Sequence, residues 1–198
     1  MFTLRHLGTQ PLRTARLTLL PQTTADAIPM FENWASDPEV TRYLRWEPHQ
    51  SWTDTAALLA AWEPLYQNPD YYQWGIHLNE SGVLIGSISL QRGEESDPGA
   101  WRVPGLDFSQ GVWDPGYCIG RAFWNRGYTT EALLAVRDYW FNQVGGSWLA
   151  CCHASANPAS GRVMQKAGWV YDHDAVYHKF NGAPVDCRVY YQKNPNEP

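Results

Sequence analysis

The chain has 198 residues, of which 44% are hydrophobic and 18% charged, and its formal net charge is −5. This balance is typical of a globular protein, so we expect a single domain over residues 1–198 with its core at about residues 12–192. The acidic balance argues against a nucleic-acid partner and favours the approach of a cationic or amine substrate.

The chain shows no sign of a membrane segment or a disulfide framework. Its N-terminus lacks the apolar core of a signal peptide, and no apolar run approaches membrane-spanning length. The four cysteines have no framework spacing; they are Cys118, Cys151, Cys152 and Cys187. We therefore predict reduced thiols in a cytoplasmic protein with no membrane partner.

Aromatic residues are unusually frequent, with 11 Trp and 11 Tyr in the chain. Such side chains suit a deep cleft or an interface, and they suit core packing equally well. The sequence leaves both roles open.

The first half of the chain combines strand patterns with helical ones. A β-rich run at residues 16–20 predicts the first strand. Capping residues then predict three helices, which begin near Thr24 or Asp26, at Asp37, and at Ser51 or Thr53. Two further β-rich runs, residues 71–78 and 83–90, flank a turn and predict a hairpin.

The second half continues the alternation of strands and helices. In chain order we expect a long polar loop at 91–111, a strand at 112–119, a helix at 129–144, a strand at 148–153, a helix opening at Asn157, a hairpin around Asn181, and a disordered tail at 194–198. This order predicts an α/β fold with a mixed sheet of about six to seven strands, flanked by about four to five helices.

The segment from Gly116 to Glu131 is the most informative part of the chain. It reads as a short strand that passes through a basic, glycine-bearing turn into a long helix. Such a turn points backbone N–H groups and the positive end of the helix dipole at one anion. Arg121 and Arg126 flank the turn, and Gly127 leaves room for a phosphate to approach. A pyrophosphate-bearing cofactor is therefore the first hypothesis.

Three motifs lie in and after this turn. They are Trp-Asn-Arg-Gly-Tyr-Thr at residues 124–129, its continuation Gly-Tyr-Thr-Thr-Glu-Ala at 127–132, and Asn157-Pro158-Ala159-Ser160 followed by Gly168-Trp169. Together they resemble the GNAT superfamily of acetyl-CoA-dependent N-acetyltransferases, and within it the branch that acetylates the N-termini of ribosomal proteins. Asn125 stands where that branch usually has a glycine, although Asn tolerates left-handed backbone geometry better than most residues.

The resemblance implies a GNAT-like fold in which a splayed strand pair binds acetyl-CoA, with no metal. It implies that Cys118 and Ile119 offer backbone groups to the pantetheine arm, that Asn157 binds the arm's amides, and that Ser160 protonates the departing thiolate. The pyrophosphate would be held by backbone N–H groups of Arg126, Gly127, Tyr128, Thr129 and Thr130.

Each of these assignments has a purely structural alternative. The strand would be half-buried, the turn an ordinary helix start, Asn157 a helix cap, and Ser160 a helix-start serine.

A general base is harder to identify. An amine acceptor must lose a proton, so a carboxylate or imidazole near the site would help. Glu131 lies in the first turn of the long helix, where we expect a structural role. The remaining candidates, none of which the sequence singles out, are His77, Asp107, Asp114, His153, Asp172 and His178.

The expected function is an N-acetyltransferase that moves an acetyl group from acetyl-CoA directly to a primary amine. The branch resemblance favours a protein N-terminus as the acceptor, and the acidic balance with many aromatic residues favours a small molecule. The main alternative is a non-catalytic acyl-CoA-binding or regulatory module on the same fold. A small α/β domain without a nucleotide partner is a further alternative, and homodimer formation is left open.

Overall fold

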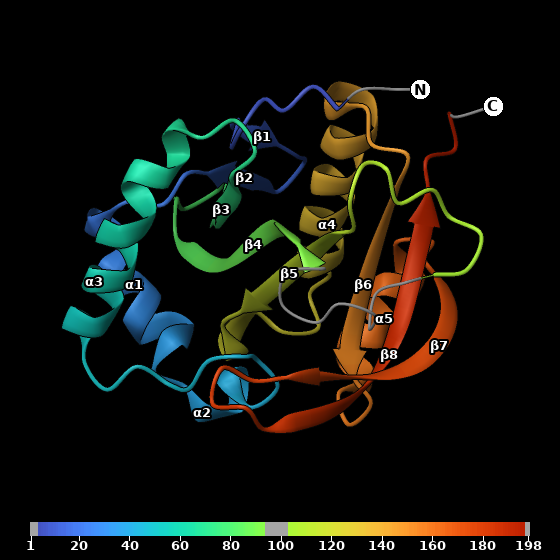
Figure 1. Cartoon of the computed structure of the whole chain (residues 1–198). Helices are drawn as coiled ribbons and strands as arrows, with labels where there is room; N and C mark the ends of the chain where they lie inside the picture. Colours follow the sequence, from blue (N-terminus) through green and yellow to red (C-terminus); the bar gives the residue numbers. More distant parts are fainter. Residues whose placement is uncertain (1–3, 94–102, 197–198) are drawn as a thin grey trace.

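The computed structural model describes residues 4–93 and 103–196 of the chain (Figure 1). Its α-helices are α1 (Ala27–Met30), α2 (Pro38–Thr41), α3 (Trp52–Trp62), α4 (Tyr128–Tyr139) and α5 (Pro158–Lys166). Its strands are β1 (Leu12–Arg13), β2 (Leu17–Leu20), β3 (Tyr72–Leu78), β4 (Leu84–Arg92), β5 (Trp113–Ile119), β6 (Trp148–Ala154), β7 (Val170–His178) and β8 (Pro184–Lys193). Much of the long loop expected at residues 91–111 lies outside the described residues.

Capping residues set the starts of the N-terminal helices. α1 continues a short helical turn that begins at Thr24. At α2, the Asp37 side chain accepts a hydrogen bond from the Glu39 backbone N–H at 2.9 Å. At α3, Ser51 and Asp54 form a capping box. The three helices predicted for the first half of the chain are therefore confirmed.

The strands form two antiparallel sheets, one in the order β1-β2-β3-β4-β5 and one in the order β6-β8-β7. β3 and β4 make the first predicted hairpin, with Tyr72 opposite Leu90. β7 and β8 make the second, with His178 opposite Pro184. Both hairpins that the β-rich runs and turn residues predict are therefore confirmed.

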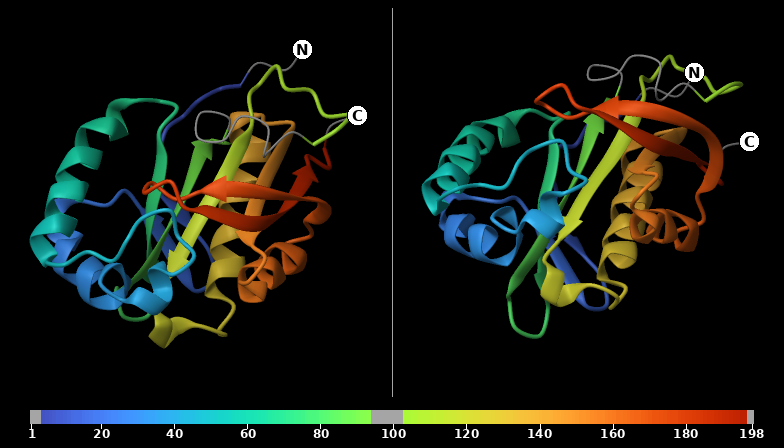
Figure 2. Two further views of the ribbon diagram at one scale, coloured as in Figure 1. Left: turned by 60° about the horizontal axis from the view of Figure 1, so that its bottom comes forward. Right: turned by 90° about the horizontal axis from the view of Figure 1, so that it is seen from below.

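Helices cover both faces of the sheet layer (Figure 2). α1 and α3 lie on one face, and α4 and α5 lie on the other. The core between these layers is rich in aromatic residues, and the largest fully buried side chains include Trp34, Trp74, Trp140, Tyr72 and Tyr139. Core packing therefore accounts for many of the aromatic residues.

The two sheets meet at β5 and β6. Near the start of the pair, the Cys151 thiol lies 3.1 Å from the Pro115 carbonyl oxygen. At the C-terminal end of β5, the Ile119 carbonyl accepts a hydrogen bond from the Trp124 indole N–H at 2.8 Å, and not from β6. Within the described part of the chain, no ladder joins β5 to β6. This is the splayed strand pair that the resemblance implied.

Two details differ from the sequence expectation. The described strands number eight, because β1 has only two residues and shows no periodic pattern. Asn194, expected in a disordered tail, is buried and donates to the Phe141 and Gly146 carbonyl oxygens at 3.3 and 3.0 Å. The chain is therefore anchored through Asn194, while residues 197–198 lie outside the described residues.

Candidate active site

The turn between β5 and α4 has the backbone conformation of an anion-binding loop. A short 3-10 turn at Arg121–Phe123 follows β5, and α4 begins at Tyr128. Asn125 and Gly127 have φ values of 60° and 79°, both in the left-handed region. Glycine adopts this region freely because it lacks Cβ, and Asn is one of the few other residues that tolerate it. The predicted glycine-bearing turn is confirmed, and Asn125 fits it.

The backbone N–H groups of this turn are available to a ligand. The Glu131 N–H donates to the Gly127 carbonyl at 3.1 Å, which closes the first turn of α4. Among the described residues, the backbone N–H groups of residues 125–130 have no hydrogen-bond partner, and no side chain caps this helix end. Free N–H groups and a positive helix end favour a bound anion.

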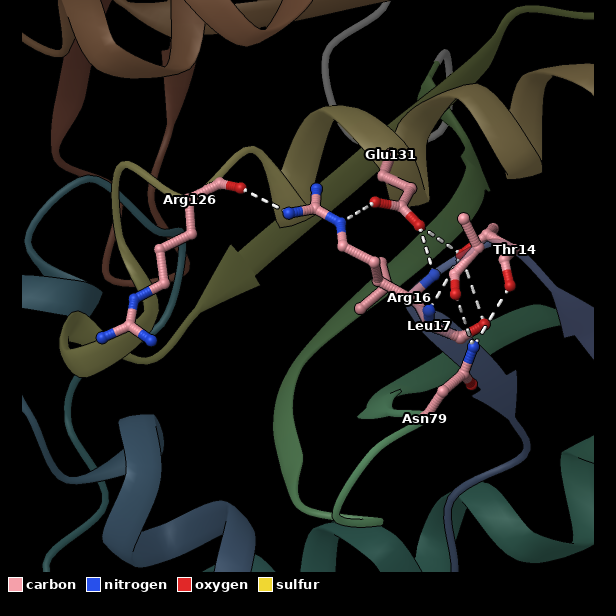
Figure 3. A network of polar contacts seen from close by, with 7 residues as sticks. Thr14, Arg16, Leu17, Asn79, Arg126 and Glu131 are labelled. Carbon is pink, nitrogen blue, oxygen red and sulfur yellow. Dashed lines mark hydrogen bonds and ion pairs between the residues drawn. The ribbon is translucent and has the colours of Figure 1, made fainter.

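A polar network joins the other side of the turn to β2 (Figure 3). Arg16 Nη1 donates to the Arg126 carbonyl at 3.0 Å, and Arg16 Nε lies 2.7 Å from Glu131 Oε2. The Arg16 guanidinium also lies 4.6 Å from the centre of the Tyr128 ring. Arg16 therefore holds the carbonyl side of the turn and leaves the N–H side free. Arg16 was not among the residues predicted for this turn, because no local pattern links it to a segment so distant in the chain.

Glu131 has the structural role that its position predicted. Its Oε1 accepts from Thr14 Oγ1 at 2.6 Å and from the Arg16 backbone N–H at 2.9 Å. Partial burial opposes its ionisation, but the hydrogen bonds from Thr14 and Arg16 outweigh this and lower the pKa of Glu131. The carboxylate is thus committed to the network.

The hydrogen-bond pattern of β5 decides which backbone groups face β6. The Gly120 N–H donates to the Ile85 carbonyl at 2.8 Å, and the Gly93 N–H donates to the Val112 carbonyl at 3.0 Å. The register between these two points is unbroken. In an antiparallel ladder, residues that bond to the neighbour alternate with residues that face away. The even-numbered residues of β5 therefore bond to β4, and the odd-numbered ones face β6.

This alternation corrects one of the sequence assignments. Cys118 lies opposite Ser87, and its thiol is 3.4 Å from Ser87 Oγ. Its backbone groups face β4, so they do not suit a ligand between the sheets. The backbone groups of Tyr117 and Ile119, which are odd-numbered, lie on the side of β6. A one-residue error is easily made from sequence, because the register of a strand is set by its neighbours.

Asn157 and Ser160 lie together at the start of α5. Asn157 Oδ1 accepts from the Ser160 N–H at 3.4 Å, so Asn157 caps the helix. Its amide nitrogen has no hydrogen-bond partner among the described residues, so capping leaves two donors for a ligand. Ser160 Oγ lies 3.0 Å from the Tyr117 hydroxyl. This contact joins α5 to β5 across the boundary between the sheets.

Asp114 is the candidate base that the structure singles out. It lies on β5, within hydrogen-bonding reach of the Cys151 thiol on β6. Burial raises the pKa of Asp114 to about 7, although the Cys151 thiol and the nearby Arg45 guanidinium act in the opposite direction. A carboxyl group with such a pKa is suited to accept a proton near neutral pH.

The other candidate bases have different surroundings. His153 packs against Gly161 of α5, its Nδ1 lies 2.8 Å from the Ala154 carbonyl oxygen, and burial lowers its pKa. The rest lie in local contacts or at an exposed position: His77 with Gly82, Asp107 with Ser109, Asp172 with His173, and His178 at the end of β7.

The described residues show neither a metal-binding cluster nor a membrane-spanning helix. Within residues 4–93 and 103–196, no three His, Cys, Asp or Glu side chains are grouped as metal ligands. None of the helices in these two segments is both long enough and apolar enough to span a bilayer. All four cysteines are reduced.

Comparison with known sequences identifies a matching domain and relatives that cover most of the chain. The acetyltransferase (GNAT) domain matches residues 16–170. The uncharacterized N-acetyltransferase YoaA of Bacillus subtilis (strain 168) is 29% identical over 189 residues, which cover 94% of this chain and 98% of YoaA. The uncharacterized N-acetyltransferase p20 of Bacillus licheniformis is 24% identical over 186 residues, which cover 91% of this chain and 94% of p20.

Solved structures share the fold at lower sequence identity. A GNAT-family acetyltransferase from Bacillus anthracis superposes with a TM-score of 0.74 at 19% identity, covering 93% of this chain and 99% of the other. The ribosomal-protein-S5-alanine acetyltransferase from Vibrio fischeri has a TM-score of 0.68 at 17% identity, covering 96% of this chain and all of the other. Since the domain match spans more than half of its length, this chain belongs to the GNAT family of acetyltransferases.

Proposed function

We propose that this acetyltransferase takes its acetyl group from acetyl-CoA and passes it directly to a primary amine. The observation that carries this proposal is a set of N–H groups at residues 125–130 that have no partner in the described part of the chain. They lie next to the splayed strands β5 and β6. A diphosphate requires several N–H donors at a helix N-terminus, and an extended arm requires a strand edge with free backbone groups. Both requirements fit this part of the chain.

The residues that would hold acetyl-CoA fall into two groups. The pyrophosphate would bind the backbone of Arg126, Gly127, Tyr128, Thr129 and Thr130. The pantetheine arm would bind the backbone of Tyr117 and Ile119 and the Asn157 amide. When bound, acetyl-CoA supplies an activated acetyl thioester.

Two side chains would serve the reaction itself. Asp114 would take the proton that a primary ammonium must lose before its nitrogen can attack, a role supported by its raised pKa. Ser160 would place its hydroxyl hydrogen between the sheets, where a leaving thiolate forms. Holding the amine beside the thioester makes the attack effectively intramolecular, so no covalent enzyme intermediate is needed.

A bridge between the β7–β8 hairpin and the loop after α2 bears on the choice of acceptor. The Tyr177 hydroxyl donates to the Tyr43 carbonyl at 2.7 Å, and the Phe180 N–H donates to the Arg45 carbonyl at 2.8 Å. The Arg45 guanidinium lies 5.3 Å from the centre of the Tyr177 ring and close enough to Asp114 to lower its pKa. Because the bridge passes beside the proposed base, it favours a small primary amine as acceptor.

A peptide N-terminus is the second acceptor candidate. It is supported by the Gly-Tyr-Thr-Thr-Glu-Ala motif at residues 127–132, which resembles the branch that acetylates ribosomal proteins. We also propose a cytoplasmic location, which the reduced state of the four cysteines supports.

An acceptor screen tests this proposal. Small amines and peptides would be offered with acetyl-CoA, and release of free thiol would be measured. We expect thiol release above background hydrolysis with small primary amines, and calorimetric heat when coenzyme A is added alone. Heat without turnover on any acceptor would favour the non-catalytic acyl-CoA-binding module. The absence of heat would remove the cofactor assignment itself.

A further inference from the structure

The Tyr117 hydroxyl lies within hydrogen-bonding distance of two atoms of one residue. It is 3.0 Å from Ser160 Oγ and 3.2 Å from the Ser160 carbonyl oxygen. A phenol carries a single hydrogen, so it donates to one of these atoms at a time. The pair therefore has two arrangements.

The arrangements differ in what they leave for a ligand. If Tyr117 donates to the carbonyl, the Ser160 hydroxyl donates its hydrogen to the Tyr117 oxygen. The Ser160 hydrogen is then not available to a ligand. If Tyr117 donates to Ser160 Oγ instead, the Ser160 hydroxyl is free to donate its hydrogen to a ligand. The Ser160 carbonyl loses little in this exchange, because it lies in the first turn of α5 and accepts the helical N–H four residues later.

We propose that Tyr117 is a positioning residue that turns the Ser160 hydroxyl toward a thiolate between β5 and β6. This inference rests on the proposed function, since the thiolate would be that of coenzyme A. In the second arrangement Tyr117 donates to Ser160 and Ser160 donates onward, and two aligned hydrogen bonds polarise each other. The N-terminal end of α5 adds a favourable dipole for the negative charge.

In this proposal Ser160 acts as a hydrogen-bond donor to the thiolate, in place of the proton donor that the resemblance implied. Neither residue undergoes a covalent change, and both keep their protons. The acceptor enters as an ammonium and leaves as an amide, so its nitrogen loses two protons. One proton passes through Asp114 to solvent, and the other neutralises the thiolate. Tyr117 and Ser160 stabilise the charge only for the time between these events.

The surroundings of Tyr117 suit a permanent donor. Burial, with smaller contributions from neighbouring groups, raises the pKa of Tyr117 well above its ordinary value. The titratable groups beside it are Cys151, Asp114 and Cys152. Burial also raises the pKa of both thiols, which therefore stay neutral. Asp114 is the neighbour whose charge changes near pH 7. It is present in all the variants below, so it affects each of them in the same way.

The test measures the thiol pKa of bound coenzyme A in wild-type protein and in Tyr117→Phe, Ser160→Ala and the double variant. Thiolate formation is followed by ultraviolet absorbance at saturating protein, and calorimetry with desulfo-coenzyme A provides a binding control. Tyr139→Phe is the matched control, because it removes a buried tyrosine hydroxyl that donates to the Gly8 carbonyl at 2.7 Å, away from Ser160.

We expect Tyr117→Phe to raise the bound thiol pKa by about one unit, the effect of weakening one charge-assisted hydrogen bond. Ser160→Ala should raise it by at least as much, and the double variant no further than Ser160→Ala alone. Affinity for desulfo-coenzyme A should stay within about twofold in Tyr117→Phe, because that ligand has no thiol to stabilise. Tyr139→Phe should leave the thiol pKa unchanged.

Several results would overturn this role for Tyr117. They are an unchanged thiol pKa in Tyr117→Phe, pKa shifts that add in the double variant, and an equal loss of affinity for coenzyme A and desulfo-coenzyme A in Tyr117→Phe. The last result would mark Tyr117 as a merely structural residue. In each of these cases coenzyme A still binds the wild-type protein, so the proposed function stands. If neither ligand binds the wild type, the proposed function fails together with this inference.

Discussion

Burial brings the pKa of Asp114 to about 7, which places its ionisation in the range where a base for an amine is useful. Only the deprotonated form accepts a proton, so we expect kcat/KM of the wild type to rise with pH through about 7. Asp114→Asn should lower kcat about 100-fold and remove this rise. A pH–rate profile of both proteins provides the measurement, with Asp107→Asn as the exposed control. An unchanged acidic limb in Asp114→Asn would assign the base to another group.

The same raised pKa predicts how stability depends on pH. Because the folded protein holds the Asp114 proton more tightly than the unfolded chain, its contribution to stability is complete at low pH. That contribution is lost as pH rises from the ordinary carboxyl range through about 7. Asp114→Asn should therefore show a smaller fall in Tm between pH 5 and pH 8 than the wild type, measured by calorimetric melting. Parallel melting curves over this range would contradict the buried environment.

Arg16 should matter for ligand binding more than for stability. Its side chain is 48% exposed, and exposed ion pairs contribute less than about 1 kcal/mol. It nevertheless fixes the Arg126 carbonyl, so Arg16→Met should weaken coenzyme A binding about tenfold. Arg16→Lys should rescue little, because one ammonium cannot reproduce the planar fork that reaches both Glu131 and Arg126. Calorimetric titration measures this, and Arg13→Met on β1 is the control. Equal affinities in Arg16→Met and Arg13→Met would show that the turn needs no such support.

At the scale of the elements, local sequence signals predicted most of what the structure contains. Capping residues located α2 and α3, and turn residues located both hairpins. The contributions that sequence could not supply are long-range. Three features of the site depend on neighbours that are distant in the chain. They are the ladder that turns Cys118 toward β4, the partial burial of Asp114, and the contact between Tyr117 and Ser160. Local sequence therefore identifies the elements around the candidate site, whereas the orientation of its side chains and backbone groups depends on the fold.

The turn before α4 allows a controlled test of its backbone geometry. Gly127 and Gly182 have φ values of 79° and 85°, and substitution by Ala at either position strains the left-handed backbone by roughly 1 kcal/mol. Both Gly127→Ala and Gly182→Ala should therefore lower the free energy of unfolding by similar amounts in denaturant titrations. Only Gly127→Ala should weaken coenzyme A binding, because only Gly127 lies among the free N–H groups. An equal loss of affinity in both variants would place the phosphate elsewhere.

At the scale of the whole molecule, the proposed ligand would connect two sheets that share no ladder in the described residues. One end would contact β5 and α4 beside the five-stranded sheet, and the other would contact α5, which packs beside β6. Coenzyme A at 100 times its Kd should add about 2.7 kcal/mol of stability, which corresponds to a rise in Tm of about 5–10 °C for a chain of this size. Hydrogen exchange should slow in β5 and in α5 together, since a ligand that spans both must order both. Protection confined to α4 would show that only the phosphate loop is engaged, and the splayed strands would then have to serve another ligand.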